Sequence, residues 1–362
     1  MNLSLGHVPA GWKRVRGVVT SNDIARLAGV SRATVSRVLN GSEHTSPEAR
    51  ERVREAIART GYVPDAAARS LVGQRSHTIA LSLFSTDAHH IHSYFARPSN
   101  FFYHDLLGSI EAGATEAGYD ILLVPRKRES ADSYVRALRA RRIVGIIMMC
   151  PDLTDARIGA LEEAGIPTVY VDARVQGLRA TFIETDKIDG AQQATSHLLE
   201  LGHQRIAFIG AQAGSVTSGQ RELGYQQAFM RRGLSCDMSL VRHEGFEPEH
   251  GYAGTMSLLA QRSDFTAIEA VSDMVAFGVL RALYERGLSV PGDMSVTGFD
   301  DNILAGFTTP PLTTVRQDTA RMGRGVVARL RDLIEGESKP LPLIVPTQLV
   351  VRQSTGAPSV RD

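Results

Sequence analysis

The sequence contains little cysteine and no long apolar run. Its two cysteines, Cys150 and Cys236, lie in an apolar run and a polar loop, with no spacing that suits a metal site or a disulfide framework. No apolar run approaches the length of a membrane span, and the first 17 residues lack the apolar core of a secretory signal. We therefore expect a cytoplasmic protein without a membrane partner.

The sequence also lacks the motifs that most directly indicate catalysis. It has no phosphate-cradling glycine motif, no nucleophile elbow and no His-Cys metal spacing. His89, His90, His92 and His104 gather in or beside an unusual stretch at residues 86–100, where a metal site is conceivable. Because no cysteine or helical spacing supports that site, we favour a solvated insertion and expect no enzyme activity, metal or cofactor.

The near-zero net charge of +1 conceals an uneven distribution of charge. Residues 1–77 hold 12 Lys and Arg against 6 Asp and Glu, whereas the remaining residues hold 28 against 33. This excess favours a nucleic-acid partner for the N-terminal part alone. A chain of 362 residues is also too long for one typical core, so we expect two or three domains.

Residues 30–41, VSRATVSRVLNG, predict a helix that lies against DNA. Ser31 is a good N-cap, three apolar residues fall on one face at helical spacing, and the pair Asn40-Gly41 supplies a stop. The opposite face is cationic and short, which suits base edges and phosphates in a major groove. That face carries Arg32, Ala33, Thr34, Ser36 and Arg37.

A second predicted helix precedes this one. Thr20 can cap it, Asp23 falls in its first turn, and Gly29 provides a tight turn between the two helices. Together they predict a helix-turn-helix, whose second helix enters the major groove. The alternative is a helical hairpin of an ordinary globular protein, but a packing face would be apolar where this one is basic.

Residues 23–41, DIARLAGVSRATVSRVLNG, resemble the DNA-binding segment of the lactose/galactose repressor (LacI/GalR) family. Further matches extend this resemblance from about Thr20 to Gln353. Downstream, Ser46 caps a helix with Pro47 at its first position, and this third helix, which ends at Gly61, closes a small all-α core.

The alanine-rich segment that follows the head resembles the family's hinge helix. The resemblance implies that this helix folds when two subunits meet on the operator, that Leu71 is a wedge in the minor groove, and that Ala68 lets paired helices approach. A plain linker is the alternative. We also expect residues 1–17 to be a disordered leader, although a DNA-touching arm is conceivable.

From His77 onward the pattern changes to α/β. Short apolar runs predict buried parallel strands, and helical runs separate them. The predicted strands span 78–83, 120–124, 144–149 and 168–171 in one series and 205–209, 267–270 and 295–299 in a second. The predicted helices include 106–117, 156–164, 190–201, 219–232 and 274–285.

This pattern predicts an α/β body of two doubly wound parallel-sheet lobes with a cleft between them, like periplasmic sugar-binding proteins. The family resemblance adds three crossings between lobes, which we place near Thr185, Thr314 and Leu343. The predicted divisions are a leader (1–17), a helix-turn-helix domain (18–62), a hinge helix or linker (63–76), an N-lobe (77–184 and 315–342), a C-lobe (186–313 and 343–355) and a tail (356–362).

The expected cleft offers groups that suit a polyol, which needs charged or amide partners for its hydroxyls and aromatic faces for its C–H surfaces. By resemblance, Arg221 is the family's cleft arginine, whose planar fork can grip two oxygens. Asp300 is likewise the acidic acceptor, and Ser272 stands where the family commonly has asparagine. Asp172 and Asp186 are weaker candidates that also follow strands. The ligand-binding set is Asn100, Phe102, Tyr103, Asp172, Arg221, Phe246, Ser272, Asp273, Asp300 and Gln317.

Taken singly, such residues are more often structural, because a strand-end Asp usually caps a helix and a Phe usually belongs to a core. Their joint occurrence at strand ends favours a ligand cleft. The sequence therefore predicts a homodimeric repressor that reads a near-palindromic operator and responds to a small-molecule effector, in the first place a sugar and otherwise a nucleoside or purine. The DNA-binding set is Thr20, Ser31, Arg32, Ala33, Thr34, Ser36, Arg37, Asn40, Ala68 and Leu71.

Two other functions share parts of this pattern. An enzyme could use the α/β halves, but the catalytic motifs are missing. A transport binding protein shares the cleft, but it would require export and has no use for a DNA-reading head. The tail 353–362 has no heptads, so a tetramerising coil is not expected.

Overall fold

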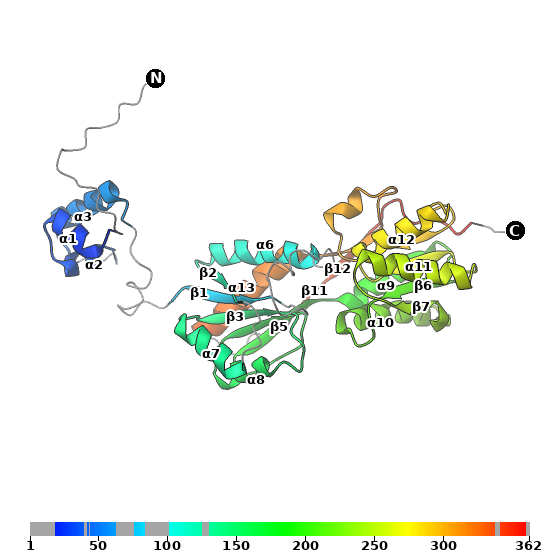
Figure 1. The fold of residues 1–362 in the computed structure, drawn as a ribbon, viewed down its shortest axis with the longest axis horizontal. Coiled ribbons are helices and arrows are strands. Elements are labelled where there is room, and N and C mark those ends of the chain that lie inside the picture. The colour runs from blue at the N-terminus through cyan, green and yellow to red at the C-terminus, as the bar shows by residue number, and fades with distance from the viewer. Residues whose placement is uncertain are drawn as a thin grey trace, which may run out of the picture. The chain divides into compact units, whose positions relative to one another are not determined.

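A computed structural model describes residues 19–39, 42, 44–62, 76–83, 101–124, 130–336 and 341–359 (Figure 1). The chain divides into two compact units, residues 1–76 and 77–362. In the described part, no helix combines the length and the apolar character that crossing a membrane requires. Several predicted features lie outside the described residues: the leader, Asn40, the hinge with Ala68 and Leu71, and the insertion with Asn100.

The first unit is the predicted three-helix head. Its helices are α1 (Ser21–Ala28), α2 (Arg32–Leu39) and α3 (Pro47–Thr60). Thr20 and Asp23 form a reciprocal capping box at the start of α1, and Ser46 caps α3. Gly29 has φ 63° in the turn between α1 and α2, a conformation that glycine adopts without strain.

The head has a small core of its own. Ile24, Val35 and Val53, one from each helix, are completely buried, and Tyr62 closes the cluster. The predicted third helix and its core are therefore confirmed. The apolar face of α2 packs into this core, so its polar face lies at the surface.

The second unit contains two parallel sheets and one antiparallel pair. The six-stranded sheet has the order β11-β5-β4-β3-β1-β2, and the four-stranded sheet has the order β7-β6-β8-β9. The strands are β1 (Thr78–Ser82), β2 (Asp120–Leu123), β3 (Gly145–Met149), β4 (Thr168–Val171), β5 (Ala180–Thr185), β6 (Ile206–Gly210), β7 (Val241–His243), β8 (Ala267–Ala270), β9 (Ser295–Thr297), β10 (Thr314–Gln317), β11 (Leu343–Val345) and β12 (Thr347–Val350).

Helices cover both faces of each sheet. In the N-lobe, alternate residues of the strands pack on opposite faces, so Ile147 lies under one helix layer and Ile146 under the other. One layer is α6 with α13, and the other is α7 with α8. These helices are α6 (Phe101–Glu116), α7 (Ala131–Ala140), α8 (Ala156–Glu163) and α13 (Thr319–Glu335).

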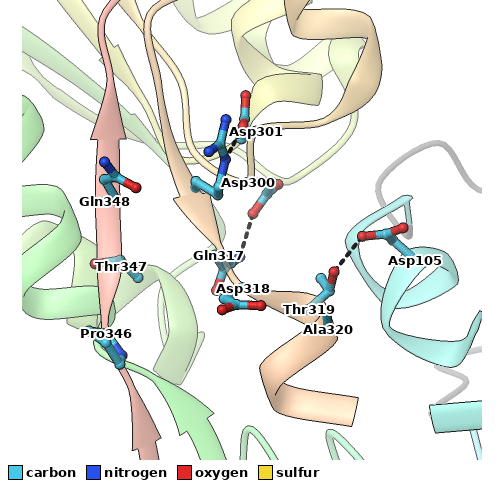
Figure 2. A pocket seen from close by; sticks show the side chains of 11 residues that line it. Asp105, Asp300, Asp301, Gln317, Asp318, Thr319, Ala320, Pro346, Thr347 and Gln348 are labelled. Atoms are coloured by element: carbon cyan, nitrogen blue, oxygen red, sulfur yellow. Dashed lines mark hydrogen bonds and ion pairs between the residues drawn. The ribbon is translucent and has the colours of Figure 1, made fainter. Parts of the chain in front are cut away.

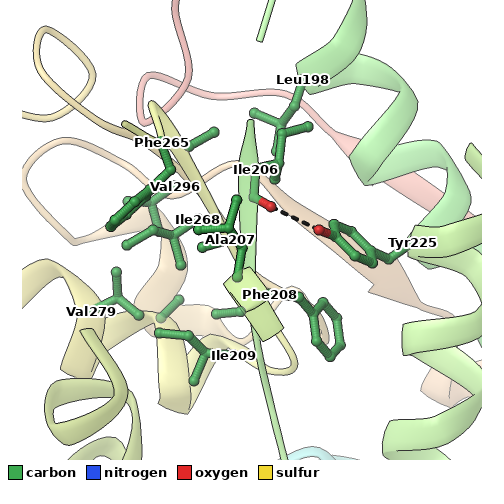
Figure 3. Packing of buried hydrophobic residues seen from close by; sticks show 14 of the residues in the cluster. Leu198, Ile206, Ala207, Phe208, Ile209, Tyr225, Phe265, Ile268, Val279 and Val296 are labelled. Carbon is green, nitrogen blue, oxygen red and sulfur yellow. Dashed lines mark hydrogen bonds between the residues drawn. The ribbon is translucent and has the colours of Figure 1, made fainter. Parts of the chain in front are cut away.

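The C-lobe has one continuous core around its four-stranded sheet (Figure 3). Phe208 on β6 is fully buried, and the hydroxyl of Tyr225 donates to the Ile206 carbonyl at 2.7 Å. The helices pack in two pairs, α9 with α10 and α11 with α12. They are α9 (Lys187–Glu200), α10 (Val216–Arg231), α11 (Pro248–Gln261) and α12 (Asp273–Glu285).

The chain crosses between lobes at three places. The first crossing lies between Thr185 and Lys187, where it was expected. The second follows Gln317, later than predicted, because β10 pairs with β12 and Arg316 bridges to Asp300 in the C-lobe. The third follows Val345, because β11 pairs with β5 in the N-lobe sheet; the assignment of residues 343–345 to the C-lobe was wrong.

Several elements had no predicted counterpart, namely α7, α11, α13, β5, β7 and β10 to β12. The missed strands have three to six residues, and so short a run contains too few positions for its periodicity to distinguish a strand from a loop. β11 and β12 are separated by a single proline residue, Pro346. Only pairing with other strands identifies them.

Candidate functional site

The polar face of α2 is the candidate DNA-reading surface. Ser31 accepts from the Thr34 amide at 3.1 Å, which starts the helix as predicted. Ser31, Arg32, Ala33 and Arg37 are exposed, whereas Thr34 and Ser36 are half-buried and Thr20 is exposed at the start of α1. The guanidinium groups of Arg32 and Arg37 therefore lie at the surface while α2 stays packed on the head core.

The candidate effector site begins with Arg221 on α10. Its side chain is only 5% exposed, and its guanidinium carbon lies 3.9 Å from the centre of the Phe299 ring. Nη1 donates to the Val271 carbonyl, and Nη2 lies 3.3 Å from an Asp300 oxygen. The remaining nitrogen, Nε, is buried and has no hydrogen-bond partner in the described part of the chain. A buried N–H without a partner is rare and favours a missing ligand or water.

Asp300 links this arginine to the crossing strands. Oδ1 of Asp300 accepts from the Gln317 amide at 2.8 Å, and Gln317 in turn accepts from the Thr185 hydroxyl. Burial raises the pKa of Asp300 to about 6, although the nearby Arg221 cation and the Gln317 hydrogen bond both lower it. The array therefore joins residues of β5, α10, the segment after β9, and β10.

A cavity of about 490 Å³ opens beside Asp300 and Gln317 (Figure 2). Pro346, Thr347 and Gln348 lie along one side of it, and Thr319 donates to Asp105 at 2.6 Å on the other. Its size is within the range of small-molecule sites. The complete lining is Asp105, Asp300, Asp301, Arg316, Gln317, Asp318, Thr319, Ala320, Pro346, Thr347 and Gln348.

The second predicted aspartate, Asp172, lies in a different cluster. It follows β4, and its carboxylate accepts from the Lys187 ammonium at 2.6 Å and from the Tyr103 hydroxyl at 3.0 Å. The thiol of Cys150 donates to the same hydroxyl at 2.7 Å. The structure therefore brings two residues of the predicted ligand-binding set, Tyr103 and Asp172, into contact, but both carboxylate oxygens of Asp172 already have protein partners.

Ser272 and Asp273 have local structural roles. The Ser272 hydroxyl caps α12 by accepting from the Val275 amide at 3.3 Å. Asp273 is completely buried and accepts from the Asn302 amide and the Thr314 hydroxyl. Burial raises its pKa well above the usual range. These contacts order the segment that carries Asp300.

The predicted aromatic residues are divided between the lobes. Phe102 lies in the first turn of α6 and makes an edge contact with Tyr103, with ring centres 4.9 Å apart. Phe246 is half-buried against the C-lobe core. Asp186, the weaker candidate, caps α9 by accepting from the Asp189 amide at 3.0 Å.

Backbone conformation sets the cleft residues apart. Positive φ angles occur at Cys150 (41°), Asp172 (54°), Asp300 (124°) and Asp301 (54°), and Arg142 is the fifth such non-glycine residue among those described. Unfavourable backbone angles of this kind persist where surrounding contacts impose them, often at functional sites. Cys150 and Asp172 directly follow β3 and β4, and Asp300 and Asp301 lie in the segment after β9.

The family described as "Bacterial regulatory proteins, lacI family" matches residues 20–65, and a "Periplasmic binding protein-like domain" matches residues 195–355. The transcriptional regulator CelR of Thermobifida fusca is 36% identical and covers 91% of this chain and 96% of its own length. The repressor PurR of Haemophilus influenzae is 32% identical, with 93% and 98% covered. The chain belongs to the LacI family.

Solved structures agree with this assignment. A lac repressor dimer bound to operator and the anti-inducer ONPF has a TM-score of 0.80 at 30% identity, covering 94% of this chain and all of its own. A CelR–cellobiose complex has a TM-score of 0.69 at 34% identity, covering 93% and 99%. This LacI-family chain is therefore a helix-turn-helix transcriptional regulator.

Sequence reasoning missed two groups of residues in this LacI-family regulator. Asp105, Thr319 and Gln348 line the cavity, and Lys187 holds Asp172. The predicted helix began at residue 190, three residues after Lys187, and its pairing with Asp172 was not predicted. Among the described residues, no group of His, Cys, Asp and Glu has the arrangement of a metal site, and His104 remains outside any such cluster.

Proposed function

We propose that this chain is a homodimeric repressor whose hold on an operator is controlled by a neutral sugar bound between its lobes. The observation that carries the proposal is the Arg221–Asp300–Gln317 array, which lies in the C-lobe and reaches the N-lobe sheet through the hydrogen bond from Thr185 to Gln317. A sugar hydroxyl can accept from Arg221 Nε and donate to Asp300 at the same time. The donor on Arg221 and the acceptor on Asp300 are thus complementary to the hydroxyl groups of a polyol.

The cavity supports a sugar rather than an anionic effector. Four carboxylates line it, and the guanidinium of Arg316, its one basic side chain, is already paired with Asp301 at 2.6 Å. A phosphate or carboxylate group would meet like charge there. The relative CelR covers 93% of this chain, and its solved structure is a complex with cellobiose. This also supports a sugar as the effector of this chain.

The head supports operator binding. Arg32, Ala33 and Arg37 are proposed to read base edges, and Thr20, Ser31, Thr34, Ser36 and Asn40 to contact phosphates or support these contacts. Ala68 and Leu71 are proposed to act at the minor groove. The lac repressor relative is a dimer on its operator, which supports two heads on a near-palindromic site.

The proposed regulator acts by binding alone, without catalysing a reaction, and works in the cytoplasm, where an operator is reached. Its relatives are transcriptional regulators rather than enzymes. In the proposed effector site, Arg221, Asp300, Gln317 and Asn100 contact hydroxyls, and Phe102, Tyr103 and Phe246 contact C–H surfaces. Asp172, Ser272 and Asp273 shape the site through the contacts described above.

A thermal-shift panel tests the effector site. The full chain is heated with glucose, ribose, cellobiose, adenosine and hypoxanthine, and we expect a sugar to raise the unfolding temperature. Arg221→Ala should abolish that rise, because the ligand loses its buried donors. Arg231→Ala, an exposed position on the same helix, is the matched control and should respond like the unchanged protein. A shift that persists in Arg221→Ala would place the ligand elsewhere, and a shift with adenosine or hypoxanthine alone would replace the sugar.

A further inference from the structure

Lys187 is a buried cation at the first crossing between the lobes. It is the first residue of α9 in the C-lobe, while its partner Asp172 follows β4 in the N-lobe. Nζ lies 2.6 Å from Asp172 Oδ1, and both side chains are 1% exposed. Within the described chain this ion pair is more deeply buried than Arg157–Asp155, whose side chains are 14% and 11% exposed.

The pair also contacts the start of α6. Asp172 Oδ2 accepts from the hydroxyl of Tyr103, which lies in the first turn of α6. Lys187 therefore reaches, through one carboxylate, an aromatic residue of the proposed effector site. The two lobes are connected here by side chains as well as by the chain itself.

A second carboxylate lies within the electrostatic reach of Lys187. Asp300, on the C-lobe side, feels both charges of the pair: Asp172 raises its pKa and Lys187 lowers it, although burial and Arg221 act more strongly. Two acidic groups from opposite lobes thus share a region of low exposure.

We propose that Lys187 is the positioning residue of the cleft: its ammonium is the buried counter-ion of Asp172, and by joining the start of α9 in the C-lobe to the end of β4 in the N-lobe it holds the first crossing in place. This inference deepens the proposed function and rests on it, because an effector would act on lobes whose arrangement without effector is set by Lys187. The ion pair itself requires no effector. It can therefore be tested without one.

The competing explanation is an ordinary structural ion pair, whose loss weakens the lobe as a whole. Breaking a buried pair leaves an uncompensated charge wherever the pair lies. Arg157–Asp155 provides the matched comparison, because it is part-buried and lies within one lobe, at the start of α8. The two explanations differ in which peptides lose protection from hydrogen exchange.

Hydrogen exchange measured by mass spectrometry on the full chain tests the proposal. We expect Lys187→Met to speed exchange at least tenfold in peptides that contain the amides of Asp172 and Asp186, which donate to Ile183 and Val345. Peptides from β6 and β8 should keep their rates. Lys187→Arg keeps the positive charge, so it should lose less protection than Lys187→Met, with the remaining loss due to fitting the larger guanidinium into a site that is 1% exposed.

The double variant Lys187→Met/Asp172→Asn supplies the decisive comparison. It removes both charges, and because neutral replacement of a buried pair often leaves stability unchanged, protection should return to within about threefold of the unchanged protein. Arg157→Met should leave the crossing peptides unchanged. If Lys187→Met does not fold, the double variant decides: normal protection supports the counter-ion role, and failure to fold overturns it.

Three other results would also overturn the proposal. These are unchanged exchange at the crossing in Lys187→Met, uniform acceleration across the whole body, and no recovery in the double variant. Because no ligand is present, each outcome is independent of whether Arg221 binds a sugar. Failure of the sugar proposal would appear only in the thermal-shift panel.

Discussion

At the scale of single residues, the buried carboxyl group of Glu269 decides how stability depends on pH. It lies in β8, 3% exposed, and burial raises its pKa to about 8 despite the hydrogen bond with Thr195. The Thr195 hydroxyl lies 2.5 Å from Glu269 Oε2 and 3.0 Å from the Ala191 carbonyl. Because one hydroxyl carries one proton, both contacts are satisfied together when Glu269 is protonated and donates.

This protonation predicts that the folded protein loses stability as pH rises. Between the usual pKa of glutamate and about 8, the folded state keeps a proton that the unfolded state has released. The contribution is fully present below the unfolded pKa and is lost as pH rises through the folded one. The loss amounts to a few kcal/mol, because each pH unit between the two pKa values is worth roughly 1.4 kcal/mol. Urea unfolding of the full chain at pH 5, 6.5 and 8.5 measures it.

Glu269→Gln should flatten this pH dependence and leave the variant more stable than the unchanged protein at pH 8.5. Glu249→Gln, an exposed position on α11, is the control and should keep the original slope. Asp273 and Asp300, whose pKa values are also raised, contribute in the same direction in every variant. Equal slopes for Glu269→Gln and the control would contradict the assignment.

At the scale of elements, the pairing of α11 with α12 depends on glycine. A Cβ atom at Gly278 would lie 1.8 Å from the Pro248 carbonyl oxygen, and one at Gly251 would lie 2.0 Å from that of Val275. The two helices therefore approach backbone to backbone. Because main-chain atoms cannot move aside as a flexible side chain can, the approach has little tolerance.

We predict that Gly278→Ala destabilises the body by about 1–3 kcal/mol or more, because the added methyl forces the helices apart. Gly219→Ala provides the matched control in the same lobe, since nothing lies within 4 Å of an added Cβ there. That exposed helical position should gain up to about 1 kcal/mol. Urea midpoints of both variants measure the difference, and a Gly278→Ala midpoint as high as the control would refute the close-packing argument.

At the scale of the whole molecule, the head is basic and the body is acidic on balance, so we expect the head alone to attract DNA. We predict that binding to a duplex selected by the protein weakens steeply with salt, because phosphate contacts release counterions. Arg32→Ala should cost about 1–3 kcal/mol and relax sequence preference if it reads a base edge. Fluorescence anisotropy at several salt concentrations measures both effects.

The control for this prediction is Arg54→Ala. Arg54 is an exposed arginine on α3 that pairs with Glu51 at 3.8 Å. It carries the same charge in the same head but lies on a different helix from the reading face. If Arg32→Ala and Arg54→Ala lose equal DNA affinity and sequence preference is unchanged, Arg32 attracts DNA through its charge and does not read a base.

Much of the fold was predictable because its signals are local. Thr20, Asp23 and Gly29 begin and end α1 through contacts a few residues apart, and the buried strand β4 was found with its correct bounds. In the site, Arg221, Asp300 and Gln317 were found through the family resemblance, and the structure brings them together. Lys187 was missed because the identity of its partner depends on how two lobes meet.

The sequence by itself determined the three-helix head, the parallel-strand body and the polar residues that follow its strands, because capping and periodicity act over a few residues. Only the tertiary structure decided which of those polar groups neutralise one another: Arg221 and Asp300 are 79 residues apart, and Tyr103 and Asp172 are 69 apart. Charges pair according to distance in space, and that distance exists only after the strands are paired and the lobes are joined.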